Sequence, residues 1–186
     1  HCHYEWEGAG SAARVIRHWT NDGEAYTLRY DLHARRTLVT DQLERQYQWE
    51  WNADCQPTAY IDAEGHLWRY VWDENRNLIE AIDPMGATTH CEYDAFGRLK
   101  STINALGQIE KTEWHARFDL PTAEIDAAGN RWSYEYDERG NLILVTDPEG
   151  HATEQAYDAR GLPHTIRDAR GGYKHMAWNA RAQMVR

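Results

Sequence analysis

The chain has 186 residues, with 30 acidic side chains against 20 basic ones and a formal net charge of −10 at pH 7. This acidic balance argues against nucleic acid as a partner, because binding to a phosphate backbone needs clustered cations. Nine Trp and eleven Tyr stand beside only two Phe, a preference for amphipathic rings that is typical of thin, half-wet sheet surfaces. No apolar stretch is long enough to span a membrane, and the three cysteines share no short spacing that would indicate a disulfide framework or a zinc site.

An aromatic ring returns along the chain every 21 residues, apart from one gap of 22. A glycine register runs beside it at an offset and is broken only at Glu44. Such a fixed period is the signature of a repeat array, in which each supersecondary unit meets the same environment as the one before it. The structural repeat positions are Tyr30, Trp51, Trp72, Tyr93, Trp114, Tyr136, Tyr157 and Trp178 in the aromatic register, and Gly23, Gly65, Gly86, Gly107, Gly129, Gly150 and Gly171 in the glycine register.

The period predicts one continuous array over residues 1–186. Residues 1–19 are interpreted as a degenerate first repeat, and residues 20–186 as eight repeats. No Ser/Gly-rich or Pro-rich linker interrupts them. The chain begins with His1 rather than Met and its period is still running at Met184, so we expect both ends to be cut from a longer protein.

In chain order, residues 68–72 form an aromatic strand face and residues 78–82 its return strand. A hairpin of the same kind follows at 93–99. The copy at 114–121 carries one inserted residue, which accounts for the single gap of 22. A further copy, at 157–163, shortens the start of its return strand by one residue.

The copy over residues 126–150 shows the repeat most clearly. In residues 132–137 aromatic side chains alternate with polar ones, which indicates a strand, and residues 142–146 form the return strand. The hairpin turn between them has Gly140 where a left-handed residue is needed. The junction turn at 147–150 has Pro second and Gly fourth, as a type I turn prefers.

The hairpin glycine is not kept in every copy, so we expect the hairpin turn to be conformationally less demanding than the junction turn. Its replacements are Ala34, Cys55, Arg76, Phe118 and Ala182.

These elements predict an all-β fold, an antiparallel meander of about sixteen strands with essentially no helix. A sheet of that length has to twist, and we expect it to be part of a curved or spiralling β-shell. The repeated ring should pack against the same ring of the neighbouring repeats and against the Leu of the return strand. A turn-tip residue such as Arg139 should contribute little to stability.

The unit Tyr-Asp-x-x-Gly-Asn/Arg-Leu, followed after a few residues by Asp-Pro-x-Gly, is the pattern of YD repeats. Residues 93–99 and 136–150 match it closely, and the chain resembles bacterial Rhs proteins over nearly its whole length, most weakly before Thr20. Related arrays occur in the toxin-complex C component and in teneurins. The resemblance implies a β-sheet spiral that forms a hollow shell around a C-terminal toxin, often delivered by type VI secretion.

Compared with such a shell, the chain has too few repeats and lacks the terminal cleavage region and the variable toxin segment. We therefore interpret it as a structural segment of the shell wall of a polymorphic toxin used in interbacterial competition, with no catalysis of its own. No residue matches a toxin active site. We therefore expect no catalytic residue, no cofactor-binding residue, no metal ligand and no cofactor. The alternative is an aromatic-repeat module that binds carbohydrate or the cell wall.

Acidic residues follow the strand-ending aromatic in many repeats. A row of carboxylates could suggest calcium binding or acid catalysis, but Asn52, Asn179 and His115 occupy the same slot, which favours a turn-capping role. The Asp-Pro pairs at 83–84 and 147–148 resemble the self-cleaving motif of Rhs shells, yet both lie on the regular junction period and are interpreted as turns. The carboxylates considered are Asp31, Asp73, Asp94, Asp137 and Asp158.

The expected partners follow from this interpretation. They are the remaining shell segments of the parent protein and an enclosed toxin polypeptide, and the parent is expected to be a secreted bacterial effector. Strand edges left unpaired at the two ends of the array would permit edge-to-edge self-association. Neither nucleic acid nor a membrane span is expected.

Overall fold

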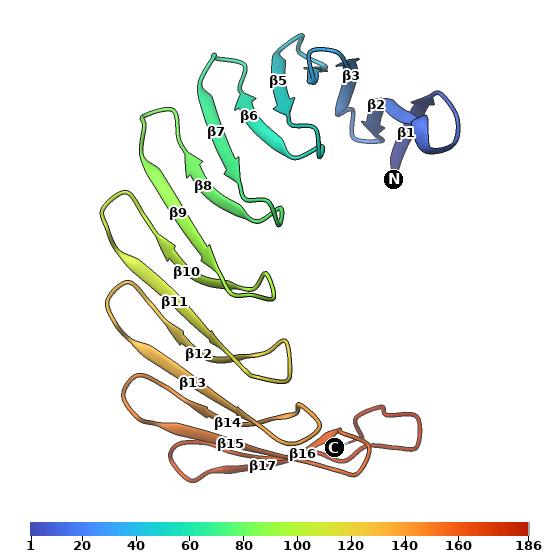
Figure 1. Ribbon diagram of the computed structural model, residues 1–186. Coiled ribbons are helices and arrows are strands. Elements are labelled where there is room, and N and C mark those ends of the chain that lie inside the picture. Colours follow the sequence, from blue (N-terminus) through green and yellow to red (C-terminus); the bar gives the residue numbers. More distant parts are fainter. Residues whose placement is uncertain (186) are drawn as a thin grey trace. The chain divides into compact units, whose positions relative to one another are not determined.

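The computed structural model describes residues 1–185, and over them the chain forms seventeen β-strands and one short 3-10 helix (Figure 1). The strands pair antiparallel, so the all-β antiparallel meander is confirmed. The chain divides into two compact units, His1–His90 and Cys91–Arg186, and strand β9 (Thr88–Tyr93) contains the boundary between them.

In the first unit each strand pairs with the next one along the chain. The elements are β1 (Cys2–Glu7), η1 (Gly10–Ala12), β2 (Arg14–Thr20), β3 (Ala25–Asp31), β4 (Arg36–Asp41), β5 (Gln46–Trp51), β6 (Pro57–Ile61), β7 (Leu67–Trp72), β8 (Leu78–Ile82) and the first residues of β9.

The second unit continues the same pattern, and each strand from β10 onward pairs with its successor. Its strands are the end of β9, β10 (Leu99–Ile103), β11 (Ile109–Trp114), β12 (Pro121–Ile125), β13 (Arg131–Tyr136), β14 (Leu142–Thr146), β15 (Ala152–Tyr157), β16 (Pro163–Arg167) and β17 (Tyr173–His175).

The strand count departs slightly from the expected sixteen at the two ends of the sequence. Residues 1–19, expected to be degenerate, contain β1 and most of β2, which pair as a hairpin with a bulge. In the last repeat, residues 177–185 form a loop closed by an isolated bridge between Trp178 and Met184 instead of a strand pair.

The sheet has almost no buried core among the described residues. Ala59 and Ala123 are its only buried hydrophobic residues, and no large side chain is fully buried. In β13, strand alternation places Trp132, Tyr134 and Tyr136 on one face, where they are exposed or half-buried. Tyr and Trp suit such a surface because one part of the ring packs while its polar group remains available for hydrogen bonding.

A β-bulge precedes the strand-end ring in most repeats. The strand register shifts between Glu135 and Tyr136 in β13, for example, so that Tyr136 lies opposite Leu142. A bulge adds one residue to one strand and re-aims the side chain beside it. The same shift occurs before Trp51, Trp72, Trp114 and Tyr157. Tyr30 has no such shift, because β3 and β4 pair in continuous register.

Most turns of both kinds contain a left-handed residue. Four hairpin turns place a non-glycine residue there, whereas only one junction turn does, at Glu44, and the hairpin turn at 115–120 has no left-handed residue. The hairpin turn is therefore the less demanding of the two, as expected. Gly129 in a junction turn has φ 86°, and Cys55, Arg76 and Ala182 in hairpin turns have φ 61°, 68° and 58°. In the first hairpin the left-handed residue is Arg35 rather than Ala34. The non-glycine residues adopt the same backbone at the cost of local strain.

We expect Gly129→Ala to lower the free energy of unfolding by about 1 kcal/mol, because a Cβ in the left-handed region is strained. No heavy atom outside its chain neighbours lies within 4 Å of the added Cβ, so the effect reports backbone conformation rather than a clash. Urea denaturation monitored by circular dichroism measures it. Ala128→Ser in the same turn is the control and should change stability little; equal stability of the two variants would contradict this assignment.

Candidate functional site

The most regular polar feature of the chain is the cap of each turn. At Asp137 one carboxylate oxygen accepts the backbone N–H groups of Arg139 and Asn141, both at 2.9 Å, and the other accepts the Asn141 side-chain amide at 2.8 Å. The corresponding Asp or Asn makes the same two backbone bonds in most other turns, for example at Asp73, Asp94, Asp158 and Asn52. Asp31 accepts one backbone N–H, from Ala34, and no such bond is found at Thr20. The turn-capping interpretation of the acidic residues is therefore confirmed.

These hydrogen bonds stabilise the ionised form of the capping carboxylate. The Asn141 side chain and then its backbone N–H hold the pKa of Asp137 below its usual 3.8. At Asp73 and Asp126 the pKa is lowered in the same way, first by the side chain four residues later and then by that residue's backbone. Because hydrogen bonds from the same turn already stabilise these ionised carboxylates, we interpret them as structural groups of the turn rather than as reactive groups.

The aromatic register connects successive repeats through hydrogen bonds. The Tyr136 hydroxyl donates to the Pro121 carbonyl at 2.8 Å, and the Trp72 indole N–H donates to the Pro57 carbonyl at 2.6 Å. In both cases the acceptor lies fifteen residues earlier, at the first residue of the preceding return strand. Four more rings reach back over the same distance: Tyr30 to Val15, Trp114 to Leu99, Tyr157 to Leu142 and Trp178 to Pro163.

This inter-repeat bond explains why the register contains Tyr and Trp but never Phe, which has no donor. The residue types were therefore a visible signal of a polar role that the prediction of a purely packing ring missed. Burial raises the pKa of the Tyr136 and Tyr157 hydroxyls, consistent with half-buried donors. Trp51 ends β5 with a backbone bond to the Arg35 carbonyl at 3.1 Å, and Tyr93 ends β9.

The expected packing of each repeated ring against the same ring of the neighbouring repeats is not the contact found, whereas the return-strand Leu does lie opposite the ring in register, as at Tyr136 and Leu142. Leaving Tyr93 aside, no ring contact in the described residues joins two rings of the aromatic register. In the first unit the contiguous rings are instead Trp49, Tyr60 and Trp68, with centroid separations of 4.5 and 5.3 Å. They belong to neighbouring strands and pack in tilted contact with one another.

Arginines on the hairpin turns form a second kind of inter-repeat contact. The Arg139 guanidinium donates to the Ala159 carbonyl of the next hairpin turn at 2.8 Å, and Arg160 donates to the Asn179 carbonyl at 2.9 Å. In the first unit, Arg76 pairs with Asp54 at 3.0 Å. Arg139 is thus engaged with the next turn, and its small contribution to stability stays a prediction.

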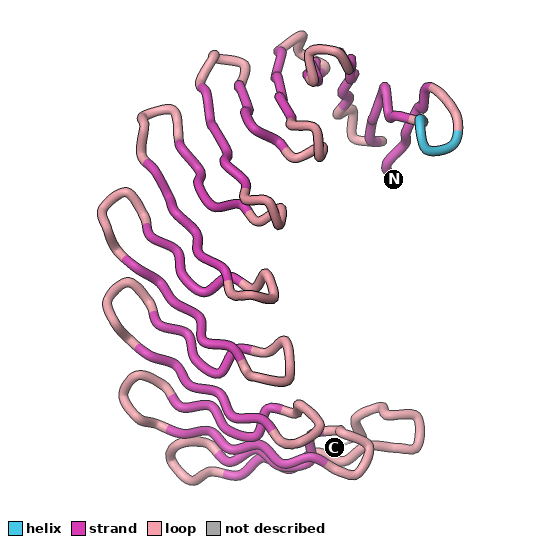
Figure 2. Tube along the Cα trace, viewed as in Figure 1, coloured by secondary structure: helices cyan, strands magenta, loops and turns pink. Residues whose placement is uncertain are grey.

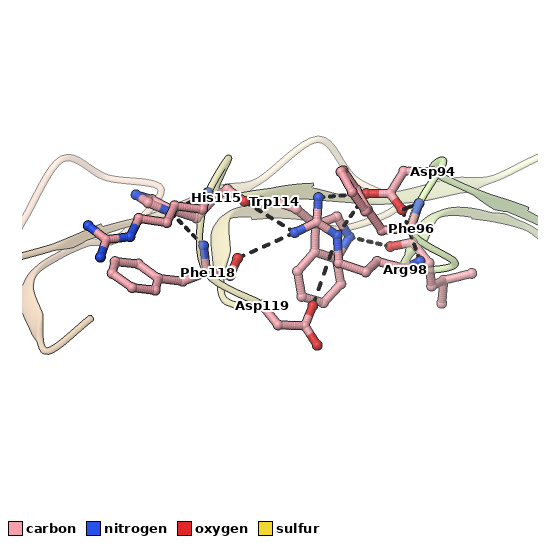
Figure 3. A network of polar contacts seen from close by, with 9 residues as sticks. Asp94, Phe96, Arg98, Trp114, His115, Phe118 and Asp119 are labelled. Carbon is pink, nitrogen blue, oxygen red and sulfur yellow. Dashed lines mark hydrogen bonds and ion pairs between the residues drawn. The ribbon is translucent and has the colours of Figure 1, made fainter. Parts of the chain in front are cut away.

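The repeat with the inserted residue has its own anchor (Figure 3). Arg98 donates to the Asp94 carboxylate at 2.7 Å and to the His115 and Phe118 carbonyls at 3.1 and 3.3 Å. Its guanidinium also lies 5.3 Å from the centre of the Trp114 ring. One half-buried arginine thereby fastens the longer turn at 115–120 to the hairpin before it.

Two junction turns bring together side chains that could ligate a metal ion. They are the groups Asp62, Glu64, His66 and Asp147, Glu149, His151. His66 Nδ1 lies 2.9 Å from an Asp62 oxygen, and His151 Nδ1 lies 3.0 Å from an Asp147 oxygen. Asn141 and Arg98 contact the capping carboxylate from the same turn position, so the histidines are explained as turn donors.

The glycine register lies in the junction turns, and each of its seven members has a positive φ. Within the described residues, no helix is long and apolar enough to cross a bilayer. The protein is therefore an antiparallel β-hairpin repeat protein. Its repeat is defined by two alternating turns, a capping acid, a left-handed residue and a ring that forms a hydrogen bond with the previous repeat.

Comparisons with known proteins identify the family of these repeats. The family model described as RHS Repeat matches residues 77–109, 117–152 and 136–173. The chain is 31% identical to "Toxin protein Tse5" of Pseudomonas aeruginosa over 95% of its own length and 14% of that protein. It is 29% identical to "Probable deoxyribonuclease RhsB" of Dickeya dadantii over 81% of its length and 11% of that protein. The chain belongs to the Rhs repeat family, and it spans a small part of these relatives.

Among solved structures, the chain aligns over its full length with 15% of a chain in the crystal structure of TcdB2-TccC3 without its hypervariable C-terminal region. The sequence identity is 12% and the TM-score is 0.35.

We expect Tyr136→Phe to lower the free energy of unfolding by about 1 kcal/mol, because the Pro121 carbonyl loses its donor while the ring is kept. Tyr173→Phe is the matched control: Tyr173 is exposed, and its hydroxyl makes no hydrogen bond within the described part of the chain. Urea denaturation of the two variants measures the difference. Equal losses would show that the hydroxyl of Tyr136 does not connect the repeats.

The capping carboxylates predict a pH dependence of stability. Their pKa values are lower in the folded chain than the usual 3.8, so the stabilisation is complete above that value and is lost as the pH falls through the folded-state pKa values. We expect Asp137→Asn to lower the melting temperature at pH 7 and the gap from wild type to shrink on acidification. Thermal melts from pH 7 to about 2 test this; a constant gap would contradict it.

Proposed function

We propose that the chain is one continuous Rhs repeat array that serves as a segment of the shell wall of a toxin, with no catalysis of its own. The observation that carries the proposal is the inter-repeat hydrogen bond between a strand-end ring and a carbonyl fifteen residues earlier, found in both units. At least six of the eight register rings make this bond, which joins a repeat to the one before it and gives the array a means of extension. The carboxylates and histidines that could suggest catalysis or metal binding are engaged in the hydrogen bonds of the turns.

The relatives support a shared structural role. Their names describe different activities, including "Double-stranded DNA deaminase toxin A", "Probable deoxyribonuclease RhsB" and "tRNA nuclease WapA". The chain matches 9%, 11% and 4% of those proteins. A segment common to proteins with different named reactions is expected to supply what they share, so the toxin activity would lie outside it.

In this proposal the array encloses a toxin polypeptide together with the remaining shell segments of a secreted bacterial effector. Delivery through type VI secretion and a role in interbacterial competition belong to the same proposal. The enclosing wall requires a curved sheet, for which the bulge before most strand-end rings provides a repeated source of local twist.

The alternative, a module that binds carbohydrate or the cell wall, is less well supported. A sugar platform needs ring faces that are open to the ligand, whereas Trp49, Tyr60 and Trp68 pack against one another. The register rings turn their donors to the protein backbone. Saturable binding of a soluble glucan or of choline by the purified chain would nevertheless favour this alternative.

Strand edges provide the test of the shell-wall proposal. Every residue of β1 and β17 is exposed, and unpaired backbone groups at an edge are templates for another strand. We expect concentration-dependent association, with slower amide exchange in Cys2–Glu7 as association proceeds. Sedimentation and hydrogen exchange measure both. A strict monomer of 21.7 kDa at all concentrations would contradict edge pairing, and hydrolysis or deamination of DNA or tRNA by the purified chain would overturn the non-catalytic role.

A further inference from the structure

The inter-repeat bond of a register ring depends on the hairpin that precedes the ring. The accepting carbonyl belongs to a residue that lies opposite a register shift, as Pro121 lies opposite Trp114 and Leu142 opposite Tyr136. The same holds for the acceptors Val15, Pro57 and Pro163. A bulge interrupts the ladder of backbone bonds, so the shift leaves a carbonyl free to accept the ring of the next repeat.

Trp51 follows the one hairpin of the first unit that has no such shift. The residue fifteen positions before it is Arg36, which pairs in continuous register with Asp31 of β3 and with Glu50 of β5. The Trp51 backbone N–H bonds the Arg35 carbonyl, and its indole N–H has no acceptor within the described residues. That indole N–H is not buried, so it remains available to a ligand.

An open cleft of about 290 Å³ lies beside this ring. Its lining comes from the ends of β3 and β5 and the starts of β2, β4 and β6, where hairpin turns of the first unit gather (Figure 2). The apolar and aromatic walls are Tyr30, Leu32, Trp49, Trp51 and Pro57. The polar residues of the lining are Arg14, Thr37, Glu50 and Cys55. Apolar walls with a few polar groups are typical of small-molecule sites.

Arg14 gives the cleft a positive charge. Its Nη1 donates to the Ala12 carbonyl at 2.8 Å, and it forms no ion pair within the described residues, although Glu7 lies opposite it in the strand register. Burial raises the pKa of the Tyr30 hydroxyl, and the Arg14 charge offsets part of that rise. The guanidinium therefore lies close to the phenol wall of the cleft and has no carboxylate partner there.

The one carboxylate of the lining is already engaged. Glu50 accepts a hydrogen bond from Gln48 at 3.0 Å and lies 3.5 Å from the Arg36 guanidinium. Strand alternation also places Glu50 on the face of the sheet opposite that of Trp49. The cleft consequently presents two free donor groups, a guanidinium and an indole N–H, beside aromatic walls.

We propose that this cleft binds a small aromatic carboxylate. The ring of the ligand packs against the apolar walls, and its carboxylate accepts hydrogen bonds from the Arg14 guanidinium and the Trp51 indole N–H. Bonds between a guanidinium and a carboxylate are charge-assisted and roughly twice as strong as neutral ones. Binding here is independent of the shell-wall role, because it needs only residues of the first unit.

The test is an NMR titration of the full chain with indole-3-acetate, which follows the indole N–H signal of Trp51. Trp51→Phe identifies that signal by removing it. We expect a saturable shift. Indole-3-acetamide has the same ring without the charge and should bind at least about fivefold more weakly, because hydrogen bonds to charged groups contribute more than neutral ones. Acetate, which lacks the ring, and choline, which has the opposite charge, should give no saturable shift.

The variants are compared through Cys55, an exposed free thiol of the lining whose alkylation by iodoacetamide a bound ligand should slow. Cys2 is exposed outside the cleft and should react at an unchanged rate. Arg14→Gln and Trp51→Phe each remove one donor and should weaken the indole-3-acetate protection of Cys55 at least about threefold. If Arg14→Gln melts early by circular dichroism, Trp51→Phe decides, because that indole has no bond to lose.

Matched controls are Arg69→Gln and Trp132→Phe, which alter an exposed arginine and an exposed indole outside this cleft. Both should bind indole-3-acetate as wild type does. An unshifted Trp51 signal, equal binding of the acid and its amide, wild-type protection of Cys55 in Trp51→Phe, or equal weakening in the controls would each overturn the carboxylate site. None of these results bears on the shell-wall role, which edge association tests separately.

Discussion

The structure depends on a hydrogen bond between the polar edge of a strand-end ring and a carbonyl of the preceding repeat. A sheet whose only buried hydrophobic side chains among the described residues are Ala59 and Ala123 has no central core to hold distant parts together. Stability must therefore come from contacts between neighbours, as in other quasi-one-dimensional arrays. The ring supplies such a contact because it packs on the sheet face and its hydroxyl or indole N–H donates to a backbone carbonyl rather than to water.

The turns make this contact repeatable. A capping side chain such as Asp137 satisfies two backbone N–H groups, and a left-handed residue lets the chain return at a fixed angle. The register shift in front of most rings is not needed for the bond, because Tyr30 reaches the Val15 carbonyl from a strand pair in continuous register. Each device is local, so the same short pattern gives the same geometry in both units.

Much of this could be predicted from sequence. The strand alternation in residues 132–136, the turn glycines and the capping acids act over a few residues, and their patterns indicated the correct elements. The acceptor of the ring could not be identified, because a contact fifteen residues away depends on how the strands of neighbouring repeats pair. The absence of Phe from the aromatic register nevertheless pointed to a donor. Left-handed Cys55 and Arg76 were also missed, because nothing in those residue types favours a positive φ.

The most direct test of the central claim is hydrogen exchange of a chain in which Tyr30, Tyr136 and Tyr157 are all replaced by Phe. If the hydroxyl bonds connect the repeats, amide exchange should quicken in the acceptor strands β2, β12 and β14 as well as in the strands that carry the rings. Unchanged exchange in the acceptor strands would contradict the account.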